Sequence, residues 1–202
     1  MEYIYHAADN AEYTFVLLHG TGGDETNLIP LAKEISSSAN ILSIRGTVNE
    51  NGALRYFKRK AEGLYDLEDL AERSDELVEF IKKMSSEKGF DLSKVIFIGF
   101  SNGSNIALNI LIHYPESFNK GILFAPLYPM AIDQQKDLSN HQLFLSMGEA
   151  DPICSMQANN DLIKKLTNIQ ADLSIEWVHT HQITPQIVQD AKDWVSNLKE
   201  NN

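Results

Sequence analysis

The sequence has a single cysteine, Cys154, among its 202 residues, so an internal disulfide is excluded. Such sparing use of cysteine suits a protein that folds in a reducing compartment. The amino terminus, MEYIYHAADN, has neither the basic nor the apolar segment of a secretory signal peptide. No apolar run approaches the roughly 20 residues that a membrane-spanning helix needs. We therefore expect a cytoplasmic protein without membrane insertion.

Basic residues are scarce as well. The chain has 17 Lys and Arg against 28 Asp and Glu, which gives a net charge of −11. A protein that grips nucleic acid needs Lys and Arg against the phosphates, so this balance argues against a nucleic-acid partner. The phosphate-loop patterns G-x-x-x-x-G-K-[ST] and G-x-G-x-x-G are also absent. We therefore expect a small molecule as the partner.

Short apolar runs alternate with amphipathic segments along the chain. Strands are predicted at 14–18, 41–44, 95–98, 121–127, 142–147 and 171–178, with an edge strand at 2–6. Helices are predicted at 28–36, 66–88, 106–114, 155–168 and 185–198. This alternation is typical of an α/β fold with a mostly parallel sheet and helices on both faces. The length suits one domain over residues 1–202.

The segment from Val95 to Gly103 is the most informative one. VIFIGF predicts a buried strand, and Gly99-Phe100-Ser101-Asn102-Gly103 matches G-x-S-x-G just before a helical pattern. A serine on a sharp turn between strand and helix is a nucleophile elbow. A side chain at either glycine would collide with the turn. We therefore predict that Ser101 is a nucleophile.

An α/β-hydrolase places its triad in the chain order serine, acid, histidine. Asp151 directly follows the predicted strand 142–147 and is the favoured acid, with Glu149 as its local rival. Only His179 and His181 follow Asp151. His181 lies further beyond the last strand, just before a helix start, and is the favoured base. In these roles His181 would take the serine proton and Asp151 would fix the imidazole tautomer.

A glycine cluster, His19-Gly20-Thr21-Gly22-Gly23, follows the predicted strand 14–18. Glycines at the carboxyl end of a buried strand let backbone N–H groups approach a ligand closely. We predict that the N–H groups of Thr21 and Asn102 form an oxyanion hole. Gly22 and Gly23 are predicted substrate contacts. A plain turn is the alternative interpretation of this cluster.

A basic island, Arg55-Tyr56-Phe57-Lys58-Arg59-Lys60, lies within a segment from Arg45 to Tyr65 that the sequence predicts to be long and irregular. One interpretation is a solvated surface loop. The other is a substrate-contacting loop with Phe57 or Tyr56 turned toward the site, because long loops in compact domains are often functional. Phe57 is therefore a candidate substrate contact.

With these residues the chain resembles the phospholipase/carboxylesterase family of small α/β-hydrolases, and within it the bacterial carboxylesterase-like branch associated with hydroquinone and quinone stress. The matching stretches are Leu17 to Glu25, Arg45-Gly46, 50–52, 55–57, Gly99 to Gly103, 151–154 and 181–184. Relatives usually carry glycine where this chain has Thr180. The resemblance implies the α/β-hydrolase fold, the triad Ser101, Asp151 and His181, ester or thioester hydrolysis, and no cofactor; we expect no metal ligand in the site.

The predicted function is that of a serine carboxylesterase acting on short-acyl esters. Only about fourteen residues separate the predicted strands that end near Leu127 and start near Gln142, which leaves no room for a cap domain. An acyl-thioesterase or a lysophospholipase is the alternative, since both use the same triad. A function of a different class also fits the sequence: a stress-response or binding protein with the hydrolase fold and little turnover. A homodimer is left open.

Overall fold

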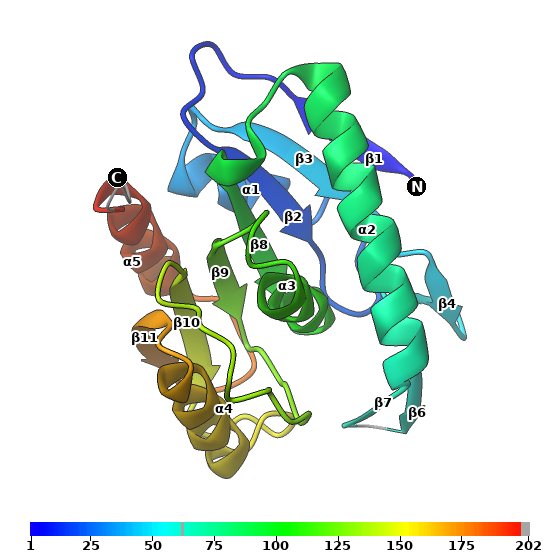
Figure 1. Ribbon diagram of the computed structural model, residues 1–202, viewed down its shortest axis with the longest axis vertical. Coiled ribbons are helices and arrows are strands. Elements are labelled where there is room, and N and C mark those ends of the chain that lie inside the picture. Colours follow the sequence, from blue (N-terminus) through cyan, green and yellow to red (C-terminus); the bar gives the residue numbers. More distant parts are fainter. Residues whose placement is uncertain (62, 199–202) are drawn as a thin grey trace.

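A seven-stranded sheet forms the centre of the computed structural model, which describes residues 1–61 and 63–198 (Figure 1). The strand order is β1-β3-β2-β8-β9-β10-β11. Its strands are β1 (Tyr3–His6), β2 (Thr14–Leu18), β3 (Asn40–Ile44), β8 (Val95–Phe100), β9 (Lys120–Phe124), β10 (Gln142–Gly148) and β11 (Asp172–Val178). β1 pairs antiparallel with β3, and every other pair is parallel. The predicted, mostly parallel sheet with an amino-terminal edge strand is confirmed.

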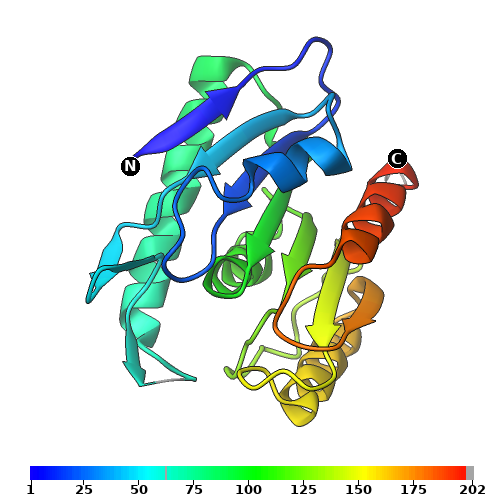
Figure 2. The same cartoon turned by 180° about the vertical axis from the view of Figure 1, so that it is seen from behind.

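Helices cover both faces of this sheet. α2 (Leu67–Lys88), α3 (Asn102–His113) and α4 (Met156–Asn168) lie on one face, and α1 (Ile29–Ile35) and α5 (Pro185–Ser196) lie on the other (Figures 1 and 2). Strand β2 illustrates why both faces need covering: successive side chains of a strand point to opposite faces of the sheet, and those of β2 are apolar on both. Val16 and Leu18 belong to the core under α2 and α3, and Phe15 and Leu17 belong to the core under α1 and α5. The short 3-10 helix η1 (Leu92–Lys94) leads into β8.

Capping residues fix several helix ends close to where the sequence predicts them. The Asp66 carboxylate accepts the N–H of Asp69 at the start of α2, and Gly89 ends that helix in the left-handed region with φ 76°. The Thr184 hydroxyl accepts the N–H of Ile187 at the start of α5, and Pro185 is its first residue. Such caps stabilise a helix end by roughly 0.5–2 kcal/mol.

The prediction of an irregular segment from Arg45 to Tyr65 was wrong. The segment forms two antiparallel hairpins, β4 (Val48–Glu50) with β5 (Ala53–Arg55) and β6 (Arg59–Ala61) with β7 (Leu64–Tyr65). Asn51 and Gly52 connect β4 to β5 with φ angles of 55° and 93°. Asn-Gly favours a two-residue hairpin turn because both residues tolerate positive φ.

The connection between β9 and β10, residues 125–141, contains no helix or strand. β9 itself ends at Phe124, three residues earlier than predicted. The chain therefore has no cap domain between β9 and β10, as the sequence predicts. Within residues 1–61 and 63–198, no helix is both long enough and apolar enough to cross a membrane.

Candidate active site

Ser101 lies between β8 and α3 in a strained backbone conformation, with φ 51° and ψ −113°. Its N–H donates to the Phe124 carbonyl at 2.9 Å, which ties the turn to the neighbouring strand β9. A Cβ added at Gly103 would lie 1.9 Å from the Leu18 carbonyl oxygen, and one added at Gly99 would lie 2.6 Å from the Ser104 nitrogen. Both positions therefore require glycine, as the G-x-S-x-G pattern predicts. Strain of this kind persists only where the surrounding structure enforces it.

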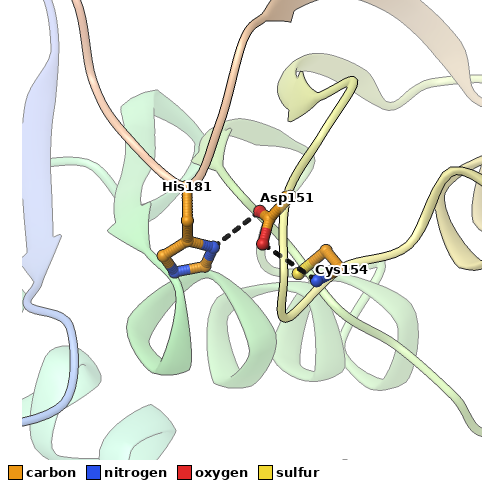
Figure 3. A group of neighbouring side chains, drawn as sticks. All are labelled: Asp151, Cys154 and His181. Carbon is orange, nitrogen blue, oxygen red and sulfur yellow. Dashed lines mark hydrogen bonds and ion pairs between the residues drawn. The ribbon is translucent and has the colours of Figure 1, made fainter.

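Asp151 and His181 meet at the carboxyl ends of β10 and β11 (Figure 3). The His181 ring Nδ1 lies 2.7 Å from Asp151 Oδ2, and Oδ1 accepts the N–H groups of Ile153 at 2.7 Å and Cys154 at 3.0 Å. The Asp151 side chain is fully buried and that of His181 is 14% exposed. Because an ionised carboxylate only accepts hydrogen bonds, a neutral His181 ring in this contact carries its proton on Nδ1 and presents a lone pair at Nε2.

A cavity of about 290 Å³ opens beside these residues. Four of the site residues predicted from the sequence line it: Thr21, Ser101, Asn102 and His181. Asp151 lies behind His181, bonded to its ring. The Phe100 ring, 5.2 Å from the His181 ring between centroids, forms part of the wall. Residues from separate segments of the chain therefore line one small cavity.

Gly22 and Gly23 do not line this cavity. The Gly22 N–H donates to the Leu54 carbonyl at 2.9 Å, and the Gly23 N–H donates to the Gly20 carbonyl at 3.0 Å. Both donors are therefore used to fold the loop, with Gly22 at φ 82°, rather than to contact a substrate. In the part of the chain that the structure describes, the N–H of Thr21 has no protein acceptor.

Phe57 also differs from its predicted position. Its side chain is fully buried and packs against the Tyr65 ring, with centroids 4.9 Å apart, so it supports the cavity wall from behind. Tyr56 is buried too. Its N–H donates to Asn102 Oδ1 at 2.8 Å, and its hydroxyl donates to the Ile44 carbonyl at 2.7 Å. The aromatic residues of the basic island therefore anchor the hairpins to the elbow.

Thr180 occupies its position without strain. Among the described residues other than glycine, positive φ angles occur at Asn10, Asn51, Ser101, Ala125 and Gln170, and Thr180 is not one of them. Its carbonyl accepts the N–H of Gln182 at 2.9 Å. The loop before His181 therefore accommodates a β-branched residue at position 180 without a positive φ.

Comparison with known proteins identifies the family of this chain. Residues 1–199 match the sequence model of the phospholipase/carboxylesterase family. The chain belongs to the phospholipase/carboxylesterase family. The MhqD hydrolase of Bacillus subtilis strain 168 is 35% identical over 195 residues, which cover 96% of this chain and 97% of MhqD.

Two solved structures of similar sequence share the fold of this family member. The Bacillus cereus carboxylesterase matches with a TM-score of 0.93 at 39% identity, covering 97% of this chain and 93% of its own. The structure of YahD with malic acid matches with a TM-score of 0.93 at 35% identity, covering 98% and 99%. The family and these relatives make the chain a hydrolase of the carboxylesterase type.

Part of the cavity wall in this family member was missed from the sequence. The Tyr65 hydroxyl donates to the Leu127 carbonyl at 2.8 Å, Asn105 Nδ2 donates to the Tyr65 oxygen at 2.7 Å, and the Leu127 N–H donates to Asn105 Oδ1 at 2.7 Å. Burial raises the pKa of Tyr65, so its hydroxyl stays neutral. Asn105 lies one helical turn after Ser101, and this spacing is the signal that could have found it.

Arg55 and Arg59 line the cavity as well. They come from the basic island, which the sequence singles out, but its charges rather than its aromatic rings reach the site. The pairing of β4 with β5 turns Arg55 inward, where it is buried. The sequence could not assign this orientation because the two hairpins were not predicted.

Cys154 is buried next to Asp151 and His181 (Figure 3). One ligand atom from each of Asp151, Cys154 and His181 lies within 4.8 Å of the others, a spacing that a metal ion could use. Burial and the Asp151 carboxylate raise the pKa of the Cys154 thiol to about 12. A metal ligand must be a thiolate, so this environment disfavours metal binding at neutral pH. Cys154 is therefore best described as a buried small side chain.

Proposed function

We propose that this protein is a serine carboxylesterase in which Ser101 is the nucleophile, His181 the general base and Asp151 the acid that positions the base. The observation that carries the proposal is the His181–Asp151 hydrogen bond of 2.7 Å beside the cavity that Ser101 lines. The Nε2 lone pair of His181 would take the hydroxyl proton as Ser101 attacks the ester carbonyl. Asp151 would stabilise the imidazolium that forms. Water would then hydrolyse the acyl-enzyme with His181 again acting as base.

The oxyanion that forms during attack would be held by the N–H groups of Thr21 and Asn102. Asn102 is the first residue of α3, so its N–H lacks an intrahelical acceptor and lies at the positive end of the helix dipole. Removing one such donor typically lowers kcat about 10²- to 10³-fold. This chemistry requires no cofactor.

Small substrates fit this site best. A volume of about 290 Å³ is at the lower end for a ligand pocket. The hydrogen-bonded group of Tyr65, Asn105 and Leu127 closes one side of it. We propose short acyl groups, from acetate to about hexanoate, because each further methylene contributes about 0.8 kcal/mol only where apolar walls exclude water.

A long-chain thioesterase or lysophospholipase is the second candidate, and one observation favours it. A neighbouring cavity of about 500 Å³ is lined by Leu67, Leu70, Asn109 and Tyr128. Asn109 is one helical turn beyond Asn105, so an acyl chain that passed Tyr65 would reach this cavity.

A cytoplasmic location, a small-molecule ester as the partner, and the absence of nucleic-acid binding and membrane insertion stay predictions from the sequence.

A p-nitrophenyl ester series from acetate to palmitate, kept below the micelle limit, tests the proposal. We expect kcat/KM to level off or fall beyond hexanoate. Ser101→Ala should lose about 10⁴- to 10⁶-fold in kcat and unfold at an unchanged temperature. Near-normal activity in Ser101→Ala would overturn the mechanism. A steady rise out to palmitate would favour the long-chain alternative, and no turnover of any ester by the wild type would favour the binding-protein class.

A further inference from the structure

Two arginines on the cavity wall share one carboxylate. Arg59 Nε lies 3.0 and 3.1 Å from the two Glu50 oxygens, and Arg55 Nε lies 3.4 Å from Glu50 Oε2. Both arginines line the cavity with Ser101 and His181, whereas Glu50 does not. Among the residues that the structure describes, these two guanidinium groups against one carboxylate leave one positive charge at the wall. This local surplus occurs in a chain whose net charge is −11.

The Arg55 guanidinium is built into the site. Its side chain is 5% exposed, and NH1 donates to Thr21 Oγ1 at 2.9 Å while Nε donates to the Phe57 carbonyl at 3.4 Å. A guanidinium has five N–H donors, so these contacts leave donors for a ligand. In the described part of the chain, no acceptor is assigned to its NH2 group. Burial, and then repulsion from Arg59, lowers the pKa of Arg55. The opposite charge of a bound anion would offset both effects.

Thr21 connects this charge to the reaction centre. Its N–H is the proposed oxyanion donor, and its hydroxyl accepts from Arg55. The guanidinium therefore lies one side chain away from the position where the ester carbonyl would be held. A carboxylate two or three carbons from that carbonyl, as in a half-ester of a short dicarboxylic acid, could span this gap.

We propose that the site selects esters that carry a carboxylate within a few bonds of the ester group, and that Arg55 binds this carboxylate with support from Arg59. The inference rests on the proposed esterase function and narrows its substrate class. A planar guanidinium matches a carboxylate with two parallel hydrogen bonds, which a neutral substituent cannot form. Glu50 sets the strength of the preference because it is the counter-ion of both arginines.

The test compares monoethyl succinate with ethyl succinamate, its neutral isostere, by acid release at constant pH. The wild type should favour the carboxylate in kcat/KM by about ten- to a hundredfold, the range expected of a hydrogen bond to a charged group. Arg59→Gln should lower this ratio, because Glu50 then neutralises Arg55. Glu50→Gln should raise it, and added NaCl should lower it in all three proteins. A purely structural role of these side chains would not shift the ratio in opposite directions.

A second test measures inhibition of the wild type, so its result does not depend on the folding of a variant. Succinate should inhibit p-nitrophenyl acetate hydrolysis with a Ki at least about tenfold below that of ethyl succinamate used as a competitor. Ser101-dependent hydrolysis of both succinyl esters with a ratio near one would overturn the substrate preference and leave the esterase function standing. Hydrolysis of p-nitrophenyl acetate without hydrolysis of either succinyl ester would also overturn the substrate preference. Failure to hydrolyse any ester would refute the proposed function, and this preference with it.

Discussion

Replacing Asp151 with asparagine probes the proposed catalytic geometry at one atom. Oδ1 accepts two backbone N–H groups, from Ile153 and Cys154, and Oδ2 faces Nδ1 of His181. A carboxamide has one oxygen and one NH2 group. The carboxamide oxygen would remain with the two backbone donors, so the NH2 group would face the ring. His181 must then accept at Nδ1 and carry its proton on Nε2, the atom that should receive the serine proton.

The size of this effect follows from the hydrogen bonds. Turning the amide to restore the productive tautomer would leave two buried N–H donors without an acceptor, at about 1–3 kcal/mol each. The productive tautomer would then make up about 3% of the protein or less, since 1.4 kcal/mol corresponds to a tenfold ratio. The imidazolium also loses the carboxylate that stabilises it. Together we expect Asp151→Asn to lower kcat about 10⁴-fold, as an acid-to-amide change does in other triads, or about 5.5 kcal/mol in the barrier.

The assay is steady-state hydrolysis of p-nitrophenyl acetate, with the thermal unfolding midpoint measured alongside. Glu149→Gln is the matched control because Glu149 is the exposed rival acid two residues away, and it should keep nearly full activity. Asp151→Asn that folds normally and retains a tenth of the wild-type kcat would refute the assigned tautomer. Loss of activity in Glu149→Gln instead would transfer the role to the other acid.

Three further perturbations test other parts of the site. His181→Ala should be nearly inactive, whereas His179→Ala should keep most activity because its side chain is exposed; the reverse pattern in the same esterase assay would show that the base is misassigned. Gly20→Val should lower kcat more than KM changes, because even a Cβ there lies 2.7 Å from the Phe100 ring that packs on His181, and full activity would remove this loop from the mechanism. Tyr65→Ala should shift the preferred p-nitrophenyl ester to longer chains by opening the wall toward the second cavity, an outcome that an unchanged chain-length profile would contradict.

Patterns local in sequence predicted most of the fold. The buried strands 14–18 and 95–98 carry continuous apolar runs, and Thr184-Pro185 marks the start of α5, so short-range chemistry was sufficient. The two hairpins from residue 48 to 65 were missed because their strands are only two or three residues long. Strands that short have no apolar periodicity to detect, although Asn51-Gly52 carried a usable turn signal.

The candidate site was predicted in part. Ser101, Asp151 and His181 each follow a strand of one parallel sheet, so their loops had to meet at the same edge. The inward orientation of Arg55 depends on hairpin pairing, and the burial of Phe57 depends on its packing against Tyr65. A side chain of the basic island could face the site or the core, and only the three-dimensional register decides between them.

The central claim is that Ser101 is a nucleophile activated by His181. Labelling with a fluorophosphonate probe, followed by mass spectrometry of the modified peptide, tests it most directly. We predict rapid, stoichiometric labelling of Ser101 in the wild type and labelling slowed by at least about 10³-fold in His181→Ala, because the serine then lacks its base. Labelling of another residue, or equally fast labelling of Ser101 without His181, would contradict the mechanism.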